Sequence, residues 1–96
     1  MDVGCGEGFT LDYFYKQGWK CFGADFSSKG IQKQNPSLLE KIRFQQTNIV
    51  TESYFDGETF DVIVGNGILE HVTDKKSVLS EFYEKLKNRG YLFVLV

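Results

Sequence analysis

Three glycines and two acids near the start of the chain have the composition of a cofactor-binding loop. The segment 2–8, Asp-Val-Gly-Cys-Gly-Glu-Gly, places its glycines between an expected strand end and an expected helix start. Glycines at such a point let the backbone turn sharply and let a ligand approach without meeting a Cβ. A strand-to-helix turn without a ligand also uses glycine, so the loop alone leaves both interpretations open.

Asp25 stands at the end of the next expected strand. Because neighbouring parallel strands lie about 4.8 Å apart, its carboxylate is expected to overhang the glycine loop. There it can accept hydrogen bonds from two ribose hydroxyls. The alternative role is the cap of a helix that follows, and the glycine loop beside it favours the ligand role.

The glycine spacing separates two cofactor classes. A dinucleotide site needs G-x-G-x-x-G, or alanine at the last place, beside the pyrophosphate. Here Gly8 comes one residue early and Phe9 follows it. Asp2 and Glu7 also flank the loop, where acids repel phosphate and attract an ammonium or a sulfonium group. The loop therefore fits a cationic cofactor that carries an amino acid better than a pyrophosphate.

Strand and helix signals alternate along the rest of the chain. Short segments rich in β-branched or aromatic residues predict strands over 20–25, 42–46, 60–65 and 91–96, after a first strand that ends at Val3. Helical spacing and capping residues predict helices over 9–17, 28–34 and 75–88, the last with Val78, Leu79, Phe82 and Leu86 as its apolar stripe. This alternation predicts an α/β fold, a doubly wound and mostly parallel sheet with helices on its faces.

The chain has 96 residues, 42% of them hydrophobic and 25% charged, with a net charge of −2. These values predict one folded domain over 1–96 and give no basic footprint for nucleic acid or an acidic membrane. Its longest apolar run, 91–96, is far shorter than the roughly 20 residues that span a bilayer. Because the opening residues lack the pattern of a secretory signal, we expect a cytoplasmic protein.

Both ends of the domain are expected to be truncated. The first strand has only Met1 to Val3, and the last strand is apolar on both faces. A strand that is apolar on both faces normally pairs with a further strand, and at the edge of the sheet it would associate with another copy of the chain. The alternative is a small complete domain. By strand geometry Cys5 and Cys21 lie roughly 13 Å apart, too far for a disulfide, so two free thiols are expected.

Four segments, in order, resemble the motifs of class I S-adenosylmethionine-dependent methyltransferases: 2–8, 23–25, 60–64 leading into 69–72, and 86–92. The resemblance covers essentially the whole chain. It implies a Rossmann-like sheet of seven strands, of which this chain supplies strands one to five. It also implies S-adenosyl-L-methionine as the cofactor.

The resemblance assigns the cofactor's parts to residues of this chain. Its methionine end would lie against the glycine loop, at Gly4, Cys5, Gly6 and Gly8, with Asp2 drawing its ammonium through water. Asp25 would hold the ribose hydroxyls. Phe26 would stack on the adenine.

Further positions depart in part from the family pattern. The family commonly has Asp near position 48, where this chain has Asn48 followed by Ile49. An Asn side-chain carbonyl can accept the same hydrogen bond from adenine. Asn66 lies in the segment where the family places the transferred methyl group and part of the acceptor pocket.

His71, the single histidine, lies in that segment too. It can act as a general base toward an acceptor hydroxyl, because its ordinary pKa of about 6.5 leaves it mostly neutral at pH 7. The alternative is that Glu70 and His71 only orient the loop. Some relatives bind a divalent ion through Glu-x-x-Glu-His, but Gly67 occupies the first position here, so no metal is expected.

The resulting interpretation is a methyltransferase that acts on a small-molecule acceptor. It would contribute mainly by positioning the acceptor for in-line displacement at the sulfonium methyl group and by excluding water. Two alternatives stay open: a non-catalytic binding or dimerisation module with this fold, and an NAD-dependent oxidoreductase. The identity of the acceptor is not specified by these 96 residues.

Overall fold

The computed structural model describes residues 1–95, and Val96, which was expected to end the last strand, lies outside the described residues. Five parallel strands form one sheet in the order β3-β2-β1-β4-β5. They are β1 (Asp2–Val3), β2 (Phe22–Asp25), β3 (Arg43–Gln46), β4 (Phe60–Asn66) and β5 (Leu86–Leu95). The predicted doubly wound parallel sheet is confirmed.

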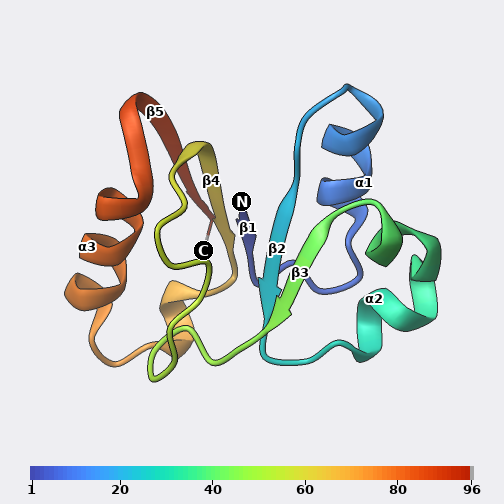
Figure 1. Ribbon diagram of the computed structural model, residues 1–96. Coiled ribbons are helices and arrows are strands. Elements are labelled where there is room, and N and C mark those ends of the chain that lie inside the picture. The colour runs from blue at the N-terminus through green and yellow to red at the C-terminus, as the bar shows by residue number, and fades with distance from the viewer. Residues whose placement is uncertain (96) are drawn as a thin grey trace.

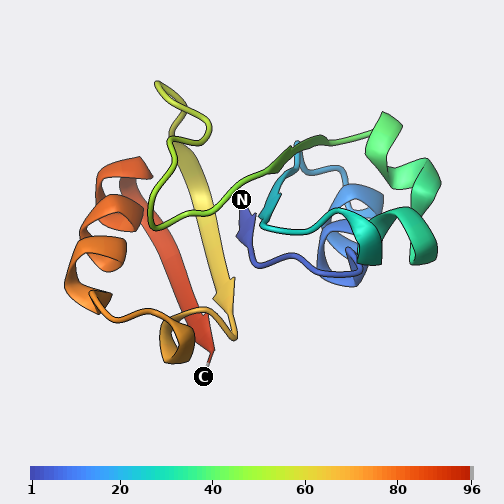
Figure 2. The ribbon, with the colours of Figure 1, turned by 90° about the horizontal axis from the view of Figure 1, so that it is seen from below.

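Helices cover the sheet from two sides (Figures 1 and 2). On one side lie α1 (Phe9–Lys16), α2 (Lys29–Gln34) and the short 3-10 helix η1 (Pro36–Glu40). On the other lies α3 (Lys75–Lys85), which is preceded by the 3-10 turn η2 (Leu69–His71). Asp74 caps α3, since its Oδ1 accepts a hydrogen bond from the Ser77 N–H at 3.0 Å.

Two hydrophobic clusters lie on the two faces of the sheet. The larger one joins Val3, Ala24 and Ile63 to Phe82 of α3. The smaller one lies under α1, α2 and η1; it contains Cys5, Leu11, Cys21, Ile31 and Leu38. Each face therefore has its own core.

The register of the central strands places the candidate residues side by side. Val3 pairs with Ala24, and the Gly4 N–H donates to the Ala24 carbonyl at 2.7 Å. Asp25 therefore lies beside the start of the glycine loop, as expected. Because β1 pairs with β2 on one side and with β4 on the other, the chain reverses direction across the sheet here, and ligands bind at such switch points in α/β folds.

The helix predicted over 75–88 is three residues too long. The structure ends α3 at Lys85, and Leu86 begins β5 with φ −81° and ψ 138°. Leu86 pairs with Phe60, and a register shift separates this pair from Val62 and Tyr91. Pairing with β4 outweighs the helical preference of these residues, an override that local propensity cannot anticipate. Leu79, assigned to the buried stripe, is 36% exposed.

The last strand has one covered and one open face. Leu92 and Val94 pack against the larger core. Tyr91, Phe93 and Leu95 alternate with them and are 66%, 53% and 53% exposed. β5 is the edge of the sheet among the residues described. In the same part of the chain, the structure contains no helix with the length and apolar character needed to cross a membrane.

Candidate cofactor cleft

A cleft of about 880 Å³ lies at the carboxyl ends of the strands, the lower edge of the sheet in Figure 1. Its walls come from the loop after β1, the end of β2, the segment after β3 and the loop after β4. The lining residues are Gly4, Asp25, Phe26, 47–51, 66–68 and 71–74. This volume lies within the usual range for small-molecule sites, about 300–1,000 Å³.

The glycine loop takes a conformation that few other residues tolerate. Gly4, Gly6 and Gly8 have φ of 77°, 54° and 85°, in the left-handed region that favours glycine. The Gly8 N–H donates to the Cys5 carbonyl at 2.9 Å, which closes the turn. A Cβ at Gly6 would meet no atom within 4 Å, so the backbone is open there. The loop can thus present bare backbone to a ligand.

Asp25 holds this loop through its carboxylate. Its Oδ2 accepts a hydrogen bond from the Gly6 N–H at 2.8 Å, and its Oδ1 accepts one from the Ser27 N–H at 3.0 Å. The cap of α2 is Ser28, so Asp25 does not take the capping role considered above. Each carboxylate oxygen can accept a second hydrogen bond. The oriented carboxylate can therefore receive two hydroxyl groups of a ligand.

The next residues form a mixed apolar and polar wall. Phe26 lines the cleft and is 78% exposed, so its ring is available for stacking. Asn48 Oδ1 accepts a hydrogen bond from the Val50 N–H at 3.0 Å, which fixes the orientation of the side chain and uses one of its two lone pairs. Ile49 packs against the core with one side. An aromatic face beside an amide suits a planar heterocycle.

The loop after β4 forms the opposite wall. Asn66 and His71 are exposed and line the cleft. The backbone N–H of His71 donates to the Ile68 carbonyl at 3.1 Å and closes the η2 turn, which carries the imidazole. Ile68 crosses the glycine loop so closely that a Cβ at Gly4 would lie 2.5 Å from its Cδ1. Sequence reasoning missed this contact, because nothing in the order of the residues pairs Ile68 with Gly4.

The cleft thus brings together seven of the eleven residues predicted for the site: Gly4, Asp25, Phe26, Asn48, Ile49, Asn66 and His71. The other four are Asp2, Cys5, Gly6 and Gly8, and they are not in its lining. Gly6 contacts the cleft indirectly, through its hydrogen bond to Asp25. Cys5 lies in the smaller core, and burial raises the pKa of its thiol to about 12, so it is not a nucleophile.

Asp2 lies beneath the loop and is 5% exposed. Its Oδ1 is buried without a hydrogen-bond partner in the protein. Burial raises the pKa of the Asp2 carboxyl from 3.8 to about 7, although the nearby amino terminus lowers it in part. Asp2 lines a separate hollow of about 40 Å³ against α1, which is too small for a cofactor.

Thr47 is a lining residue that sequence reasoning did not single out. Its N–H donates to the Asp25 carbonyl at 2.8 Å, and its Oγ1 is buried without a partner. Its position directly after β3 is the feature of the sequence that could have identified it as a cleft residue. Within residues 1–95, no group of three or more His, Cys, Asp or Glu side chains is arranged to hold a metal ion.

Sequence comparison relates the chain to methyltransferases. Residues 1–94 match the family model described as "Methyltransferase domain". The ubiquinone biosynthesis O-methyltransferases of Aliivibrio fischeri (strain ATCC 700601 / ES114) and Pasteurella multocida (strain Pm70) are 30% and 34% identical to it. Each alignment covers 97% of this chain, which spans only 41% and 43% of those relatives' lengths.

Solved structures show the same relationship. The plantazolicin methyltransferase BpumL, in complex with SAH, superposes with a TM-score of 0.81 at 27% identity. That match covers 97% of this chain and 36% of BpumL. The methyltransferase StiE O-MT gives a TM-score of 0.80 at 26% identity, over 98% of this chain and 36% of its own. With sequence, fold and the position of the cleft in agreement, the chain belongs to the methyltransferase domain family.

Proposed function

We propose that the cleft binds S-adenosyl-L-methionine and that the chain is the cofactor-binding part of a methyltransferase for small-molecule acceptors. The observation that carries the proposal is the Asp25 carboxylate, held by two backbone N–H groups beside Gly4 with acceptor capacity left over. Relatives named as O-methyltransferases and a similar structure that contains SAH, the demethylated product of this cofactor, support it.

The proposed binding mode follows the walls of the cleft. Asp25 receives the ribose hydroxyls. The adenine lies between Phe26 and the Asn48-Ile49 wall, and the amino-acid end lies along the glycine loop toward Asn66. Asp2 acts from beneath this loop, since its charge, when ionised, attracts the ammonium through the intervening backbone.

Bound S-adenosylmethionine supplies an electrophilic methyl group on a sulfonium. The names of the relatives favour a hydroxyl group as the acceptor. His71, exposed on the cleft wall, accepts the hydroxyl proton as the acceptor oxygen bonds to the methyl carbon. The bound cofactor would supply the leaving group, since the electron pair of its carbon–sulfur bond would return to sulfur. Holding the two partners in line accounts for most of the acceleration in such a displacement.

Calorimetry and a transfer assay test the two parts of this proposal separately. Titration of the 96-residue chain with SAH is expected to give saturable one-to-one binding, whereas NADH is expected to give none. Binding of NADH in place of SAH would favour the oxidoreductase alternative. A longer protein that contains this domain should transfer methyl groups to a catechol or phenol acceptor. Cofactor binding without any transfer by that protein would favour the non-catalytic module.

We also propose that the 96-residue chain self-associates through the open face and edge of β5, where Tyr91, Phe93 and Leu95 are exposed. An apolar edge strand is a known site of such association. Cys5 and Cys21 are free thiols in the structure. This fits a reducing compartment, so a cytoplasmic location is part of the proposal.

A further inference from the structure

We propose that Asn35 is a positioning residue that holds the glycine loop in its cofactor-binding shape from the junction of α2 and η1. This inference rests on the proposed function, because it assumes that the loop receives the cofactor. In the sequence, Asn35 and Pro36 directly follow the helix predicted over 28–34 and end it, because residues before proline avoid the α region. The contacts of the Asn35 side chain show a second role.

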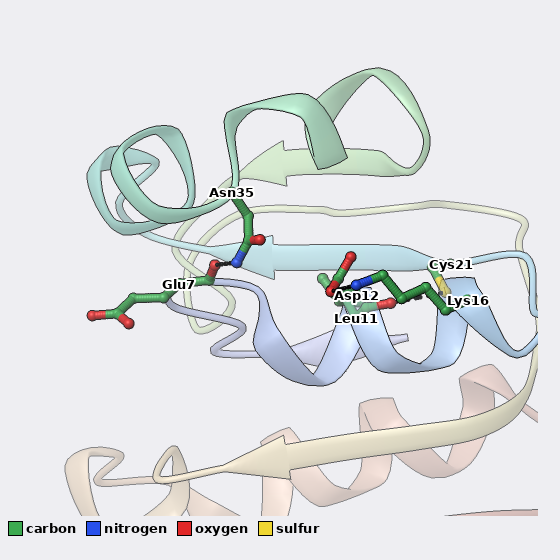
Figure 3. A network of polar contacts seen from close by, with 6 residues as sticks. All are labelled: Glu7, Leu11, Asp12, Lys16, Cys21 and Asn35. Carbon is green, nitrogen blue, oxygen red and sulfur yellow. Dashed lines mark hydrogen bonds and ion pairs between the residues drawn. The ribbon is translucent and has the colours of Figure 1, made fainter.

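The side chain of Asn35 reaches the loop directly. Its Nδ2 donates a hydrogen bond to the Glu7 carbonyl at 2.8 Å, between residues 28 positions apart in the chain. Figure 3 shows the Asn35 amide aimed at this backbone carbonyl, while the Glu7 carboxylate extends the other way. The bond therefore fixes the direction of a loop peptide group and is independent of the charge of Glu7.

The same segment supports the loop by close packing. A Cβ on Gly30 of α2 would lie 3.2 Å from the Gly6 carbonyl oxygen, so the two backbones approach closely. A Cβ on Gly8 would lie 3.0 Å from Ile31 Cδ1 and 3.2 Å from Leu38 Cδ2. The side of the loop away from the cleft is thus formed by α2 and η1.

Asn35 is well anchored for this task. Its N–H donates to the Ile31 carbonyl at 2.9 Å, and its own carbonyl accepts from the Leu38 N–H at 3.1 Å. Pro36 follows and restricts its backbone, which has φ −141° and ψ 56°. The side chain is short, with two rotatable bonds, so little freedom remains to be lost when it binds the loop.

Asn35 and Asp25 hold the loop at two neighbouring residues. Asp25 accepts from the Gly6 N–H, and Asn35 donates to the Glu7 carbonyl. Gly6 and Gly8 lie on either side of Glu7, and glycine loses more conformational freedom on ordering than any other residue. Without Asn35, the peptide between Glu7 and Gly8 loses the hydrogen bond on its carbonyl and is held only by the one from its Gly8 N–H to the Cys5 carbonyl. Cofactor binding would then have to supply the ordering that the hydrogen bond now provides.

The test uses Asn35→Leu and Asn35→Asp, with Gln32→Leu as a matched control. Aspartate keeps the shape of asparagine and removes the donor. Gln32 lies on the same α2 helix and makes a side-chain hydrogen bond to Ser28 Oγ at 3.1 Å, away from the loop. Both Asn35 variants should bind SAH about fivefold more weakly by calorimetry, the effect of one hydrogen bond, and Gln32→Leu should bind as the parent does.

Amide hydrogen exchange gives a readout that is independent of the cofactor. Exchange at Gly6 and Gly8 should quicken about fivefold in both Asn35 variants, while Ala24, in the β2 ladder, keeps its parent rate. Equal quickening at Ala24 would reveal general destabilisation and overturn the inference, as would unchanged exchange at Gly6 and Gly8. If the unsubstituted 96-residue chain does not bind SAH, the proposed function fails. Faster amide exchange at Gly6 and Gly8 in the Asn35 variants would then show that Asn35 orders the loop without positioning it for this cofactor.

Discussion

Two loops flank the switch point of the sheet, and they are held very differently. The loop after β1 is fixed by side chains from outside it, through Asp25 and Asn35, and its turn is closed by Gly8. The loop after β4 is held by backbone hydrogen bonds: the backbone N–H of His71 donates to the Ile68 carbonyl, and the Gly67 N–H donates to the Leu95 carbonyl of β5 at 2.9 Å.

This difference matches the proposed function, in which the loop after β1 binds the cofactor and the loop after β4 contacts the acceptor. A cofactor shared by a whole family needs one shape of loop, so a rigid wall lowers the ordering penalty of binding. An acceptor wall with exposed Asn66 and His71 can accommodate different chemistry on the same scaffold. The contrast predicts that a strained substitution in the loop after β1 weakens cofactor binding more than the same substitution in the loop after β4.

The largest effect is expected from Gly6→Val compared with Gly67→Val. Both glycines have positive φ, 54° and 66°, and both have room for a side chain. A β-branched residue there is strained by about 1–3 kcal/mol. In the proposed binding mode the amino-acid end of the cofactor lies along the glycine loop, so a side chain at Gly6 would meet it and abolish SAH binding in calorimetry. Gly67→Val places its side chain on the opposite wall of the cleft and should retain binding within about tenfold. Normal binding by Gly6→Val would show that the loop is only a turn.

Asp2 offers a pH test of the strand beneath the first loop. Its folded pKa of about 7 lies above its ordinary 3.8, so the folded state binds the proton more tightly and stability falls as pH rises from about 4 to about 7. The loss amounts to at most about 4 kcal/mol in the free energy of unfolding. Urea unfolding at pH 4.5 and 7.5 measures it, and Asp2→Asn should remove most of the slope. An unchanged slope in that variant would contradict the burial argument.

Asp25→Ala should weaken SAH binding by about 1.5–3 kcal/mol, the range for hydrogen bonds to a charged group, which is about 10-fold to 150-fold. Asp61→Ala is the matched control, because Asp61 is an exposed carboxylate of β4 that pairs only loosely with Lys87, at 3.4 Å. Calorimetry with circular dichroism measures both affinity and fold. Parent affinity in a folded Asp25→Ala protein would remove the ribose assignment.

The smallest effect on binding is expected on β5. Phe93→Lys and Tyr91→Lys place charges on the open face of the edge strand, outside the lining of the cleft, and should change SAH affinity less than about twofold. They should shift the chain toward monomer in sedimentation velocity, because charged edges resist pairing. A parent chain that is already monomeric at high concentration would contradict the proposed self-association.

The sheet, its direction and the place of Asp25 were predictable because strand patterns and turn residues are local signals. Parallel pairing then brings strand ends together without further information. The end of α3 was not predictable in this way, because residues 86–88 fit the helix predicted over 75–88 and belong to a strand only by pairing with β4. Two contacts could not be predicted either, because each joins segments that are distant in sequence. These are the packing of Ile68 against Gly4 and the hydrogen bond from Asn35 to the Glu7 carbonyl.

The central claim is that the cleft at the carboxyl ends of the strands binds the cofactor, and amide chemical shifts on addition of SAH test it most directly. The account predicts saturable shifts at Gly4, Asp25, Phe26 and Asn48. It predicts none around the hollow of about 180 Å³ at the amino ends of the strands, whose lining includes Trp19, Thr59 and Lys87. Shifts confined to that hollow, or no shifts at millimolar SAH, would contradict it.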